Sequence, residues 1–271
     1  EKPLSLTVRE GRQMTAAARK YNRVFQCGNL RRSMDKHRHA CQMIRSGVLG
    51  KIRTITAANY ASPWRCGLPE QPVPKNLDWD VWCGQTEPRA FHRDVFMPRA
   101  KPGWISFEPY SGGEVTGWGT HGLDQIQWAL GMDDTGPVEF WPQGDKPLDP
   151  PIYTEPEDAT RGDRLCSEGH AVSYRYANGI EVKMGDGSPA GGLFFGERGK
   201  LWLGNNEFKC NPLDLAEQPL PDDSPQLPIS DNHFQNWFDC IKSGDRPVAD
   251  VESAHRATTI CHIINITRWL G

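Results

Sequence analysis

Two side chains in this sequence are candidates for proton transfer, and each lies beside a turn-forming residue. His121 falls in segment 119–124 (GTHGLD), shortly after the glycine-rich turn at 111–114. An imidazole suits a proton shuttle, and a helix predicted to start here would lower the pKa of His121 by disfavouring the charged ring. Lys2 stands directly before Pro3. A purely structural role is the alternative interpretation for either residue taken alone.

Other catalytic signatures are weak. Segment 185–190 (GDGSPA) has the spacing of a dinucleotide-phosphate loop and follows a predicted strand. Pro189 and the glycine pair at 191–192 nevertheless preclude the helix whose N-terminus must hold the pyrophosphate, so we reject this match. The sequence has no Gly-x-Ser-x-Gly nucleophile turn. Acid–base chemistry by histidine and lysine is what remains.

Metal binding has only incomplete ligand sets. His37 and Cys41 lie four residues apart, and His233 and Cys240 lie seven apart, but neither pair has further ligands at near spacing. We therefore expect no metal site. The 8 cysteines contain no Cys-x-x-Cys pair and no dense disulfide framework, which predicts buried thiols.

Tryptophan is unusually frequent, with 10 residues in the chain. Core packing is its usual role because the ring buries a large apolar area. Segment 61–114 is rich in proline and glycine, however, and this favours one or two indole faces that stack on a sugar ring. The tryptophans gathered between positions 64 and 141 are Trp64, Trp79, Trp82, Trp104, Trp118, Trp128 and Trp141.

The first elements that must position these residues are a helix and a short strand. Thr7 and Glu10 form a capping-box pattern at the start of a helix over 7–21. Residues 24–27 (VFQC) then favour a buried strand that ends at Gly28. A helix followed by such a strand is typical of the end of a parallel α/β sheet.

The middle of the chain alternates between helix and strand. A helix is predicted over 35–46 with Asp35 as its N-cap, followed by a strand over 51–60. Apolar residues at helical spacing then predict a helix that begins near His121 and ends at Gly131.

The last third of the chain predicts hairpins and two helices. Residues 172–184 favour a hairpin with a type I′ turn at 178–179 (NG), and residues 194–203 favour a second hairpin. Helices are expected at about 234–241 and from about 250 onward. The apolar face of the last helix meets Arg268, so we expect its final turn to fray.

These elements predict a mixed fold of the α/β and α+β classes. The tail of a Rossmann-type parallel α/β unit leads into a domain with a large, mostly antiparallel open sheet and helices on one face. Since helices cover one side only, the other side needs a cover. This predicts a homo-oligomer that packs through the open sheet face.

Composition excludes several classes of protein. The 271 residues are 37% hydrophobic and 24% charged, which is ordinary for a globular chain. With 31 basic and 34 acidic side chains, no nucleic-acid partner is expected. No apolar run is long enough for a membrane span, and no membrane partner is expected. The absence of a starting Met predicts a piece of a longer protein; a cytoplasmic location is favoured and an exported or periplasmic one stays open.

Taken together, five segments resemble the Gfo/Idh/MocA family of NAD(P)-dependent sugar and polyol oxidoreductases. The Glu-Lys-Pro start is similar to a family segment that lies late in the nucleotide-binding domain, and the glycine-rich stretch through His121 resembles the catalytic helix. The order of the segments makes the resemblance specific. They are 1–19, 26–32, 44–52, 112–124 and 236–247.

The resemblance implies two domains and a set of cofactor contacts. Residues 1–33 would be the C-terminal remnant of the nucleotide-binding Rossmann domain, and residues 34–271 the substrate-binding and catalytic domain. Most of the half that binds NAD or NADP would then lie upstream of this sequence. The residues implied to contact the cofactor are Glu1, Lys2, Pro3, Gln26 and Asn29.

The resemblance also implies catalytic and substrate-binding roles. Lys2 would contact nicotinamide and the substrate hydroxyl, and His121 would exchange the hydroxyl proton as hydride moves. Asp124, about one helical turn further on, would orient His121 or bind substrate. A sugar, polyol or glycoside is the implied partner. The residues implied to contact it are Arg32, His92, Trp104, Tyr110 and Trp118.

One position departs from the family pattern. The family often has an aspartate four residues before the catalytic histidine, and Gly117 stands there in this sequence. The leading hypothesis is NAD(P)-dependent oxidation by hydride transfer with lysine and histidine assistance. The alternatives are an NAD-retaining enzyme that cleaves or epimerises a glycoside, and a non-catalytic carbohydrate-binding relative.

Overall fold

The protein is built around a seven-stranded sheet. The structure, a computed structural model, describes residues 1–87, 89–96, 103–144, 146–154, 165–167 and 169–271. Five of the six strand pairings in this sheet are antiparallel, and one is parallel. The strand order is β10 (Phe208–Asn211), β9 (Gly199–Leu203), β8 (Leu193–Gly196), β1 (Ile52–Ala58), β7 (Glu181–Gly185), β6 (Val172–Arg175) and β4 (Glu139–Pro142).

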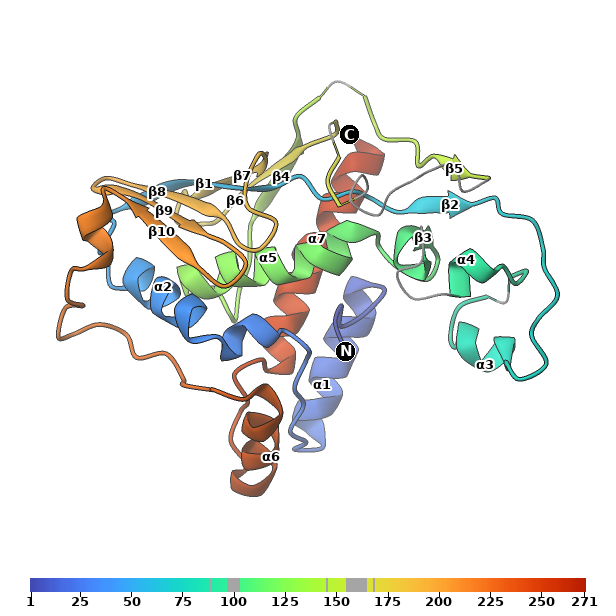
Figure 1. Cartoon of the computed structure of the whole chain (residues 1–271), viewed down its shortest axis with the longest axis horizontal. Helices are drawn as coiled ribbons and strands as arrows, with labels where there is room; N and C mark the ends of the chain where they lie inside the picture. Colours follow the sequence, from blue (N-terminus) through green and yellow to red (C-terminus); the bar gives the residue numbers. More distant parts are fainter. Residues whose placement is uncertain (88, 97–102, 145, 155–164, 168) are drawn as a thin grey trace.

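Helices cover one side of this sheet. Figure 1 shows two of them, α2 (Asp35–Arg45) and α5 (Glu114–Leu130), beneath the strands. A third, α7 (Val251–Leu270), packs along α5. The predicted fold class, with a large and mostly antiparallel open sheet and helices on one face, is confirmed.

The core lies between the sheet and these helices because strand residues alternate between its two faces. One row of cross-strand neighbours points inward and is fully buried. It consists of Leu201, Phe194, Ile55, Val182 and Tyr174. The α5 residues in the same apolar cluster include Leu123 and Ile126.

The next row of cross-strand neighbours faces away from the helices and is largely polar. It consists of Lys200, Phe195, Thr54, Glu181 and Arg175. Only Phe195 in this row is a large apolar side chain, and it is 37% exposed. The sequence predicted an apolar surface on the open side of the sheet. This row is not such a surface.

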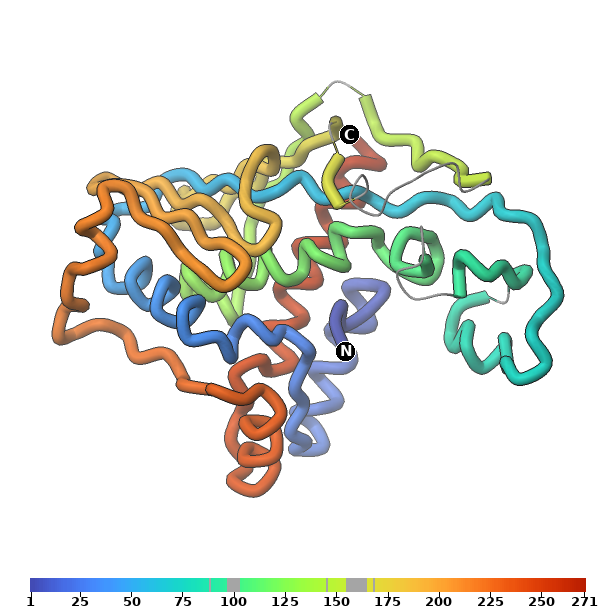
Figure 2. Tube along the Cα trace, viewed as in Figure 1, coloured from blue at the N-terminus to red at the C-terminus, as the bar shows by residue number. Residues whose placement is uncertain are grey.

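The first segment of the chain packs against the last helix. The capping box of α1 (Val8–Lys20) is confirmed, since Thr7 Oγ1 accepts from the Glu10 amide at 3.1 Å and Glu10 Oε2 accepts from the Thr7 amide at 3.0 Å. Figure 2 shows this segment, in blue, beside the red α7. Arg12 forms an ion pair with Glu252 at the start of α7.

The strand predicted at residues 24–27 is wrong. Within the described chain, Gln26 forms one isolated bridge, to Asp250, and the neighbouring residues join no strand. An apolar tetrapeptide becomes a strand only where another strand lies beside it. Here the turn that leads into α7 takes that place.

Three local predictions also need correction. Asp35 is the first residue of α2 rather than its N-cap, which is Met34. The hairpin between β6 and β7 is confirmed, but only Gly179 in its turn has a positive φ, at 85°, so the type I′ turn is wrong. The second predicted hairpin, β8–β9, is confirmed.

The predicted fraying at Arg268 is wrong as well, because all three nitrogens of its guanidinium donate hydrogen bonds. The side chain is 2% exposed, and Nε and Nη1 donate to the carbonyls of His170 and Tyr60, each at 2.8 Å. Nη2 donates to Asn59 Oδ1 at 2.7 Å. Burial lowers the pKa of Arg268 to about 10. These bonds hold the last turn of α7 in place.

The tryptophan-rich stretch forms a second apolar cluster with its own small sheet. The sheet is parallel throughout and has the order β3 (Phe107–Glu108), β2 (Trp64–Cys66) and β5 (Ile152–Tyr153). Two short helices, α3 (Trp79–Cys83) and α4 (Arg93–Phe96), lie next to it along the chain. Trp64 stacks on Tyr153 and Trp79 on Trp82, so core packing accounts for these three tryptophans.

Two exclusions concern the rest of the chain. Segment 185–190 ends β7 and leads to β8 with no helix between them, which confirms that it is not a phosphate loop. Among the described residues, none of the helices combines the length and hydrophobicity needed to cross a bilayer.

Candidate active site

Helix α5 is the element that positions the histidine. It begins at Glu114, after Gly113 at φ 80°, where an added Cβ would lie 2.4 Å from the Pro63 nitrogen. His121 is therefore the eighth residue of α5, two turns inside the helix. The influence of a helix N-terminus is confined to the first turn, so the predicted effect of that terminus on His121 is wrong. The predicted end of the helix at Gly131 is confirmed.

Lys2 lies against the same helix. Its Nζ donates to the carbonyl oxygen of Gly117 at 2.9 Å. Gly117 and His121 are four residues apart in α5 and so lie on one face of the helix. The bond between Lys2 and Gly117 thus anchors the first segment of the chain one turn away from the histidine.

A cavity of about 410 Å³ contains both residues. We call it the Lys2–His121 cavity. Glu1 and Gln26, two of the residues implied to contact the cofactor, also line it. The sequence therefore brings together four of its predicted site residues here, from segments more than 90 positions apart.

Unsatisfied amide groups lie at this cavity. Gln26 Nε2 donates to the His233 carbonyl at 2.7 Å, whereas its Oε1 is buried with no hydrogen-bond partner in the described part of the chain. The same holds for both side-chain polar atoms of Asn29, which is 1% exposed and follows the cavity residue Gly28. Buried amides of this kind fit a ligand with its own amide, as in nicotinamide.

Helix α6 (His233–Ser243) supplies cavity residues that the sequence analysis missed. His233, Phe234 and Trp237 line the Lys2–His121 cavity. His233 contacts the Cys27 carbonyl at 2.9 Å through Nε2 and the Ser33 hydroxyl at 2.8 Å through Nδ1. Burial lowers the pKa of His233, against the opposing effect of its bond to the Cys27 carbonyl. Apolar residues at helical spacing predicted this helix but not the surface that it lines, and no local motif signals a cavity wall.

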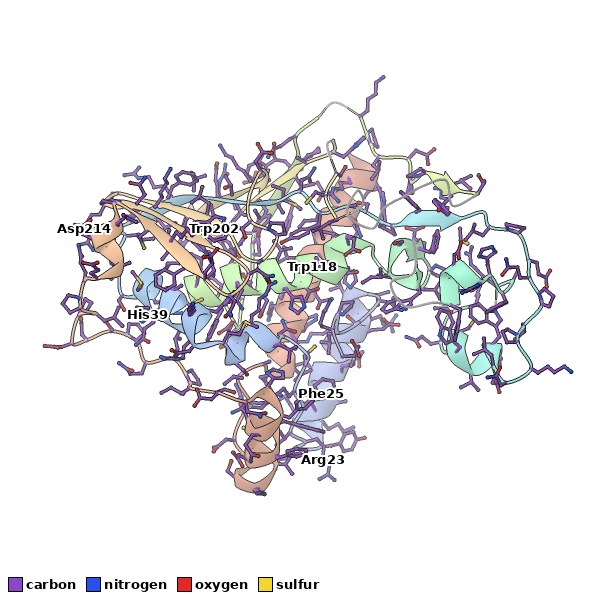
Figure 3. The ribbon with its side chains drawn as sticks, in the orientation of Figure 1. Arg23, Phe25, His39, Trp118, Trp202 and Asp214 are labelled. Atoms are coloured by element: carbon purple, nitrogen blue, oxygen red, sulfur yellow. The ribbon has the colours of Figure 1, made fainter. Side chains whose placement is uncertain are left out.

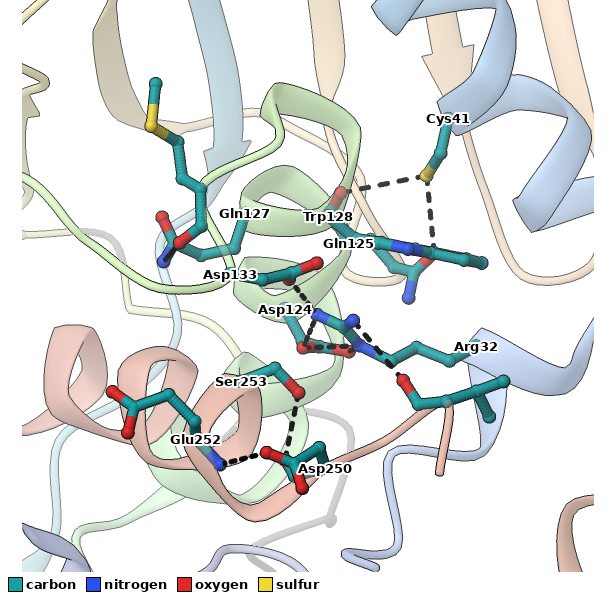
Figure 4. Close-up of polar contacts among 12 residues, drawn as sticks. Arg32, Cys41, Asp124, Gln125, Gln127, Trp128, Asp133, Asp250, Glu252 and Ser253 are labelled. Carbon is teal, nitrogen blue, oxygen red and sulfur yellow. Dashed lines mark hydrogen bonds and ion pairs between the residues drawn. The ribbon is translucent and has the colours of Figure 1, made fainter. Parts of the chain in front are cut away.

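Arg32 and Asp124 form a buried ion pair beside the site (Figure 4). Arg32 Nε lies 3.0 Å from each oxygen of Asp124, and Nη2 lies 2.8 Å from Oδ1 and 2.6 Å from Asp133 Oδ1. The Arg32 and Asp124 side chains are 3% and 1% exposed. Burial lowers the pKa of Arg32, but the charges of Asp124 and Asp133 outweigh it, and the net direction is upward.

This ion pair joins two elements rather than lining a cavity. It connects the 3-10 turn η1 (Leu30–Ser33) to α5, one turn after His121. Neither Arg32 nor Asp124 is among the described residues that line the Lys2–His121 cavity.

Trp118 lines a separate hollow of about 520 Å³, which we call the Trp118 hollow. Its other walls include Trp202 and Asn205 from the β9–β10 hairpin, and Figure 3 shows both tryptophans. Arg31 lies over the Trp118 ring at 5.6 Å and donates to Asn205 Oδ1 at 3.0 Å. The Trp118 ring also meets the edge of the His121 ring, with 6.3 Å between centroids. Trp118 therefore contacts both this hollow and the His121 ring.

The remaining predicted substrate residues lie elsewhere. Trp104, in the 3-10 turn η2 (Trp104–Ser106), and Tyr110 line a groove of about 360 Å³ that also contains Lys2. His92 is buried, with Nε2 at 3.0 Å from Gln71 Nε2, and it is not among the described residues of the groove or of either cavity above. No three His, Cys, Asp or Glu side chains are grouped for a metal ion in the parts of the chain that the structure describes.

The large open sheet with helices on one side is the architecture of an alpha/beta domain. Residues 35–271 match the profile of the oxidoreductase family, C-terminal alpha/beta domain. The chain belongs to this family, Gfo/Idh/MocA. No functionally curated protein matches the sequence.

Solved structures share the fold at low sequence identity. Aldose-aldose oxidoreductase from Caulobacter crescentus, complexed with glycerol, is 15% identical with a TM-score of 0.53 over 98% of this chain and 68% of its own. The WlbA dehydrogenase from Bordetella pertussis, in complex with NADH and UDP-GlcNAcA, is 12% identical with a TM-score of 0.53 over 98% and 67%. Levoglucosan dehydrogenase, in complex with NADH and levoglucosan, is 16% identical with a TM-score of 0.52 over 98% and 70%.

Proposed function

We propose that this protein is an NAD(P)-dependent oxidoreductase of a sugar, polyol or glycoside, with Lys2 and His121 as its catalytic pair. The observation that carries the proposal is the bond from Lys2 Nζ to Gly117 in the cavity that also contains His121. The sugar ligands and NADH named for structurally similar proteins support the substrate class and the cofactor.

The two residues act on the same substrate hydroxyl group. Lys2, as an ammonium, donates a hydrogen bond to the reacting oxygen and stabilises negative charge on it. His121 accepts the hydroxyl proton during oxidation and returns it during reduction. Such acid–base assistance contributes about 10²- to 10⁴-fold to rate. NAD or NADP, when bound, accepts or returns the hydride.

The amides at the Lys2–His121 cavity are the proposed nicotinamide contacts. Gln26 Oε1 and the side chain of Asn29 offer buried hydrogen-bonding groups, and Glu1 and Pro3 flank Lys2. Residues 1–33 then serve as the cofactor-side segment and residues 34–271 as the substrate domain.

The proposed sugar contacts lie near the catalytic pair, Trp118 beside His121 and the others in the groove that contains Lys2. Trp118 offers an indole face to a sugar ring, and Trp104 and Tyr110 offer further walls. Arg32 and Asp124 act by fixing α5 through their ion pair. His92, directly before α4, would act on the substrate indirectly, through its contact with Gln71.

The experiment is a turnover assay with aldoses, polyols and aryl glycosides in the presence of NAD⁺ or NADP⁺. We expect NADH or NADPH formation with at least one sugar, and a loss of 10²- to 10⁴-fold in kcat in Lys2→Met and in His121→Ala. His170→Ala, at an exposed histidine, is the matched control. Activity that survives both active-site substitutions would refute the proposal.

The same assay separates the second candidate, an NAD-retaining enzyme that cleaves or epimerises a glycoside. One observation favours this second candidate. At position 117, Lys2 donates to a main-chain carbonyl oxygen rather than to a carboxylate side chain. Release of sugar without net NADH supports this candidate. Sugar binding that survives His121→Ala, without any change in the NADH spectrum, supports a non-catalytic carbohydrate-binding protein instead.

We also propose self-association through the open face of the large sheet. Phe195 and Trp202 lie on that face among charged side chains, so the contact would be mixed rather than apolar. Size-exclusion chromatography with light scattering tests this proposal. A strictly monomeric protein contradicts it, and Phe195→Asp should dissociate an oligomer without unfolding the chain.

A further inference from the structure

Two charged side chains meet at Gly117. Lys2 Nζ lies 2.9 Å from its carbonyl oxygen. On the side-chain side, a Cβ at position 117 would lie 3.0 Å from Glu114 Oε2 and 2.6 Å from Ile105 Cδ1. The space that glycine leaves open is thus occupied in part by the carboxylate of Glu114, from one turn earlier on the same face of α5.

We infer that Glu114 is a positioning residue whose carboxylate takes over the electrostatic role of a side-chain acid at position 117, holding Lys2 charged and in place. The inference rests on the proposed function of Lys2. A glutamate is one methylene longer than an aspartate, which allows a residue three positions earlier to bring its carboxylate to the same spot.

The burial of Glu114 supports this role. The residue is 4% exposed, and a buried carboxylate is costly unless cations or hydrogen-bond donors face it. Glu114 also begins α5, where a negative charge is favourable near the helix N-terminus. That favourable position explains why a carboxylate is tolerated there, but it does not require the side chain to turn toward Gly117.

An acid at position 117 would crowd the carboxylate of Glu114. At 3.0 Å from the Cβ position, Glu114 Oε2 occupies the space that the carboxylate of an aspartate at 117 would enter. Gly117→Asp alone should therefore crowd two like charges and destabilise the protein. Gly117→Asp combined with Glu114→Ala should relieve the crowding and restore a carboxylate beside Lys2.

The test measures Lys2 directly. The lysines of the purified protein are reductively methylated with [¹³C]formaldehyde and titrated by NMR, and the Lys2 signal is assigned with Lys2→Arg. We expect Glu114→Gln to lower the Lys2 pKa by about one unit, since a nearby negative charge favours the ammonium. Glu108→Gln, which removes a carboxylate from a different cavity, should leave it unchanged.

Two outcomes overturn the inference: an unchanged Lys2 pKa in Glu114→Gln, or an equal fall in Glu108→Gln. A loss of stability in Glu114→Gln without a change at Lys2 assigns Glu114 to the helix terminus alone. The proposed function fails separately, when Lys2→Met keeps its activity, because the titration does not depend on turnover.

Discussion

The guanidinium of Arg32 contacts both carboxylate oxygens of Asp124 in a site from which water is excluded, with 3.0 Å from Nε to each oxygen. The pair links residues 92 positions apart in sequence. Because it joins η1, next to the residues of the Lys2–His121 cavity, to α5 one turn after His121, it fixes these two elements relative to each other.

Removal of one partner of the Arg32–Asp124 pair should therefore destabilise the folded protein. Asp124→Asn leaves the Arg32 charge buried with its main acceptor weakened, and we expect a loss of about 3–5 kcal/mol in the free energy of unfolding. Urea denaturation measures it. Asp35→Asn breaks the pair between Asp35 and Arg38, where Asp35 is 72% exposed, and should cost about 1 kcal/mol or less. Equal losses in the two variants would contradict this prediction.

Two buried histidines should make the protein sensitive to mild acid. Burial lowers the pKa of His37 to about 4 and that of His255 to about 4. An unfolded histidine titrates near 6.5, so between about pH 6.5 and 4 the unfolded chain binds more protons than the folded chain. The free energy of unfolding should therefore decrease as the pH is lowered across this window, by up to about 1.4 kcal/mol per pH unit for each histidine.

Thermal unfolding between pH 7 and 4 checks this dependence. His37→Gln and His255→Gln should each flatten the decline of Tm, and the double variant should flatten it further. His170→Gln, at an exposed position, serves as the control. A slope that the double variant leaves unchanged would assign the acid sensitivity to other groups.

A small substitution in α5 should reveal how tightly it packs. A Cβ at position 122 would lie 2.1 Å from the Tyr60 hydroxyl, which is buried and donates to the Pro189 carbonyl at 2.9 Å. Gly122→Ala should cost about 1–3 kcal/mol by overpacking, although alanine is the better helix former. Gly136→Ala, where nothing lies within 4 Å, should cost little. Tyr60→Phe should lessen the penalty of Gly122→Ala in a double-mutant cycle, and a penalty that stays the same would locate the strain elsewhere.

Trp118 should affect sugar binding more than cofactor binding. Trp118→Ala removes the indole face in the Trp118 hollow, and we expect the sugar Kd to rise roughly tenfold or more, which corresponds to about 1.4 kcal/mol. Isothermal titration with the best sugar and with NADH measures the two affinities. Trp141→Ala, on β4 beside Arg175, is the matched control. A loss of NADH affinity equal to the loss of sugar affinity would argue against a sugar contact.

The features that sequence predicted well depend on local signals. The capping box of α1 involves Thr7 and Glu10, three residues apart, and the end of α5 at Gly131 follows from the φ > 0 geometry that glycine accepts. The order of the family segments likewise placed Lys2 and His121 together before any geometry was known.

The features that sequence missed depend on distant partners. Arg268 donates to Asn59, which is 209 positions away. From the sequence alone, a charged residue at this position predicted the end of the buried apolar face. The structure shows that Arg268 is itself buried and hydrogen-bonded. The ion pair of Asp124 with Arg32 was not predicted either, because the two residues are 92 positions apart. Phe234 and Trp237 were not recognised as cavity residues because helical spacing cannot distinguish a core face from a cavity wall.

The pairing of α1 with α7 has a consequence for biosynthesis. Arg12 and Glu252 are 240 positions apart, and His262 Nε2 donates to the Ser5 carbonyl at 3.1 Å. While a ribosome is still adding residues before position 251, the segment around Lys2 lacks its contacts with α7. Contacts this distant along the chain form late in folding. The cavity is therefore completed only after the sheet beside it has been made, and a nascent chain cannot carry out the proposed reaction.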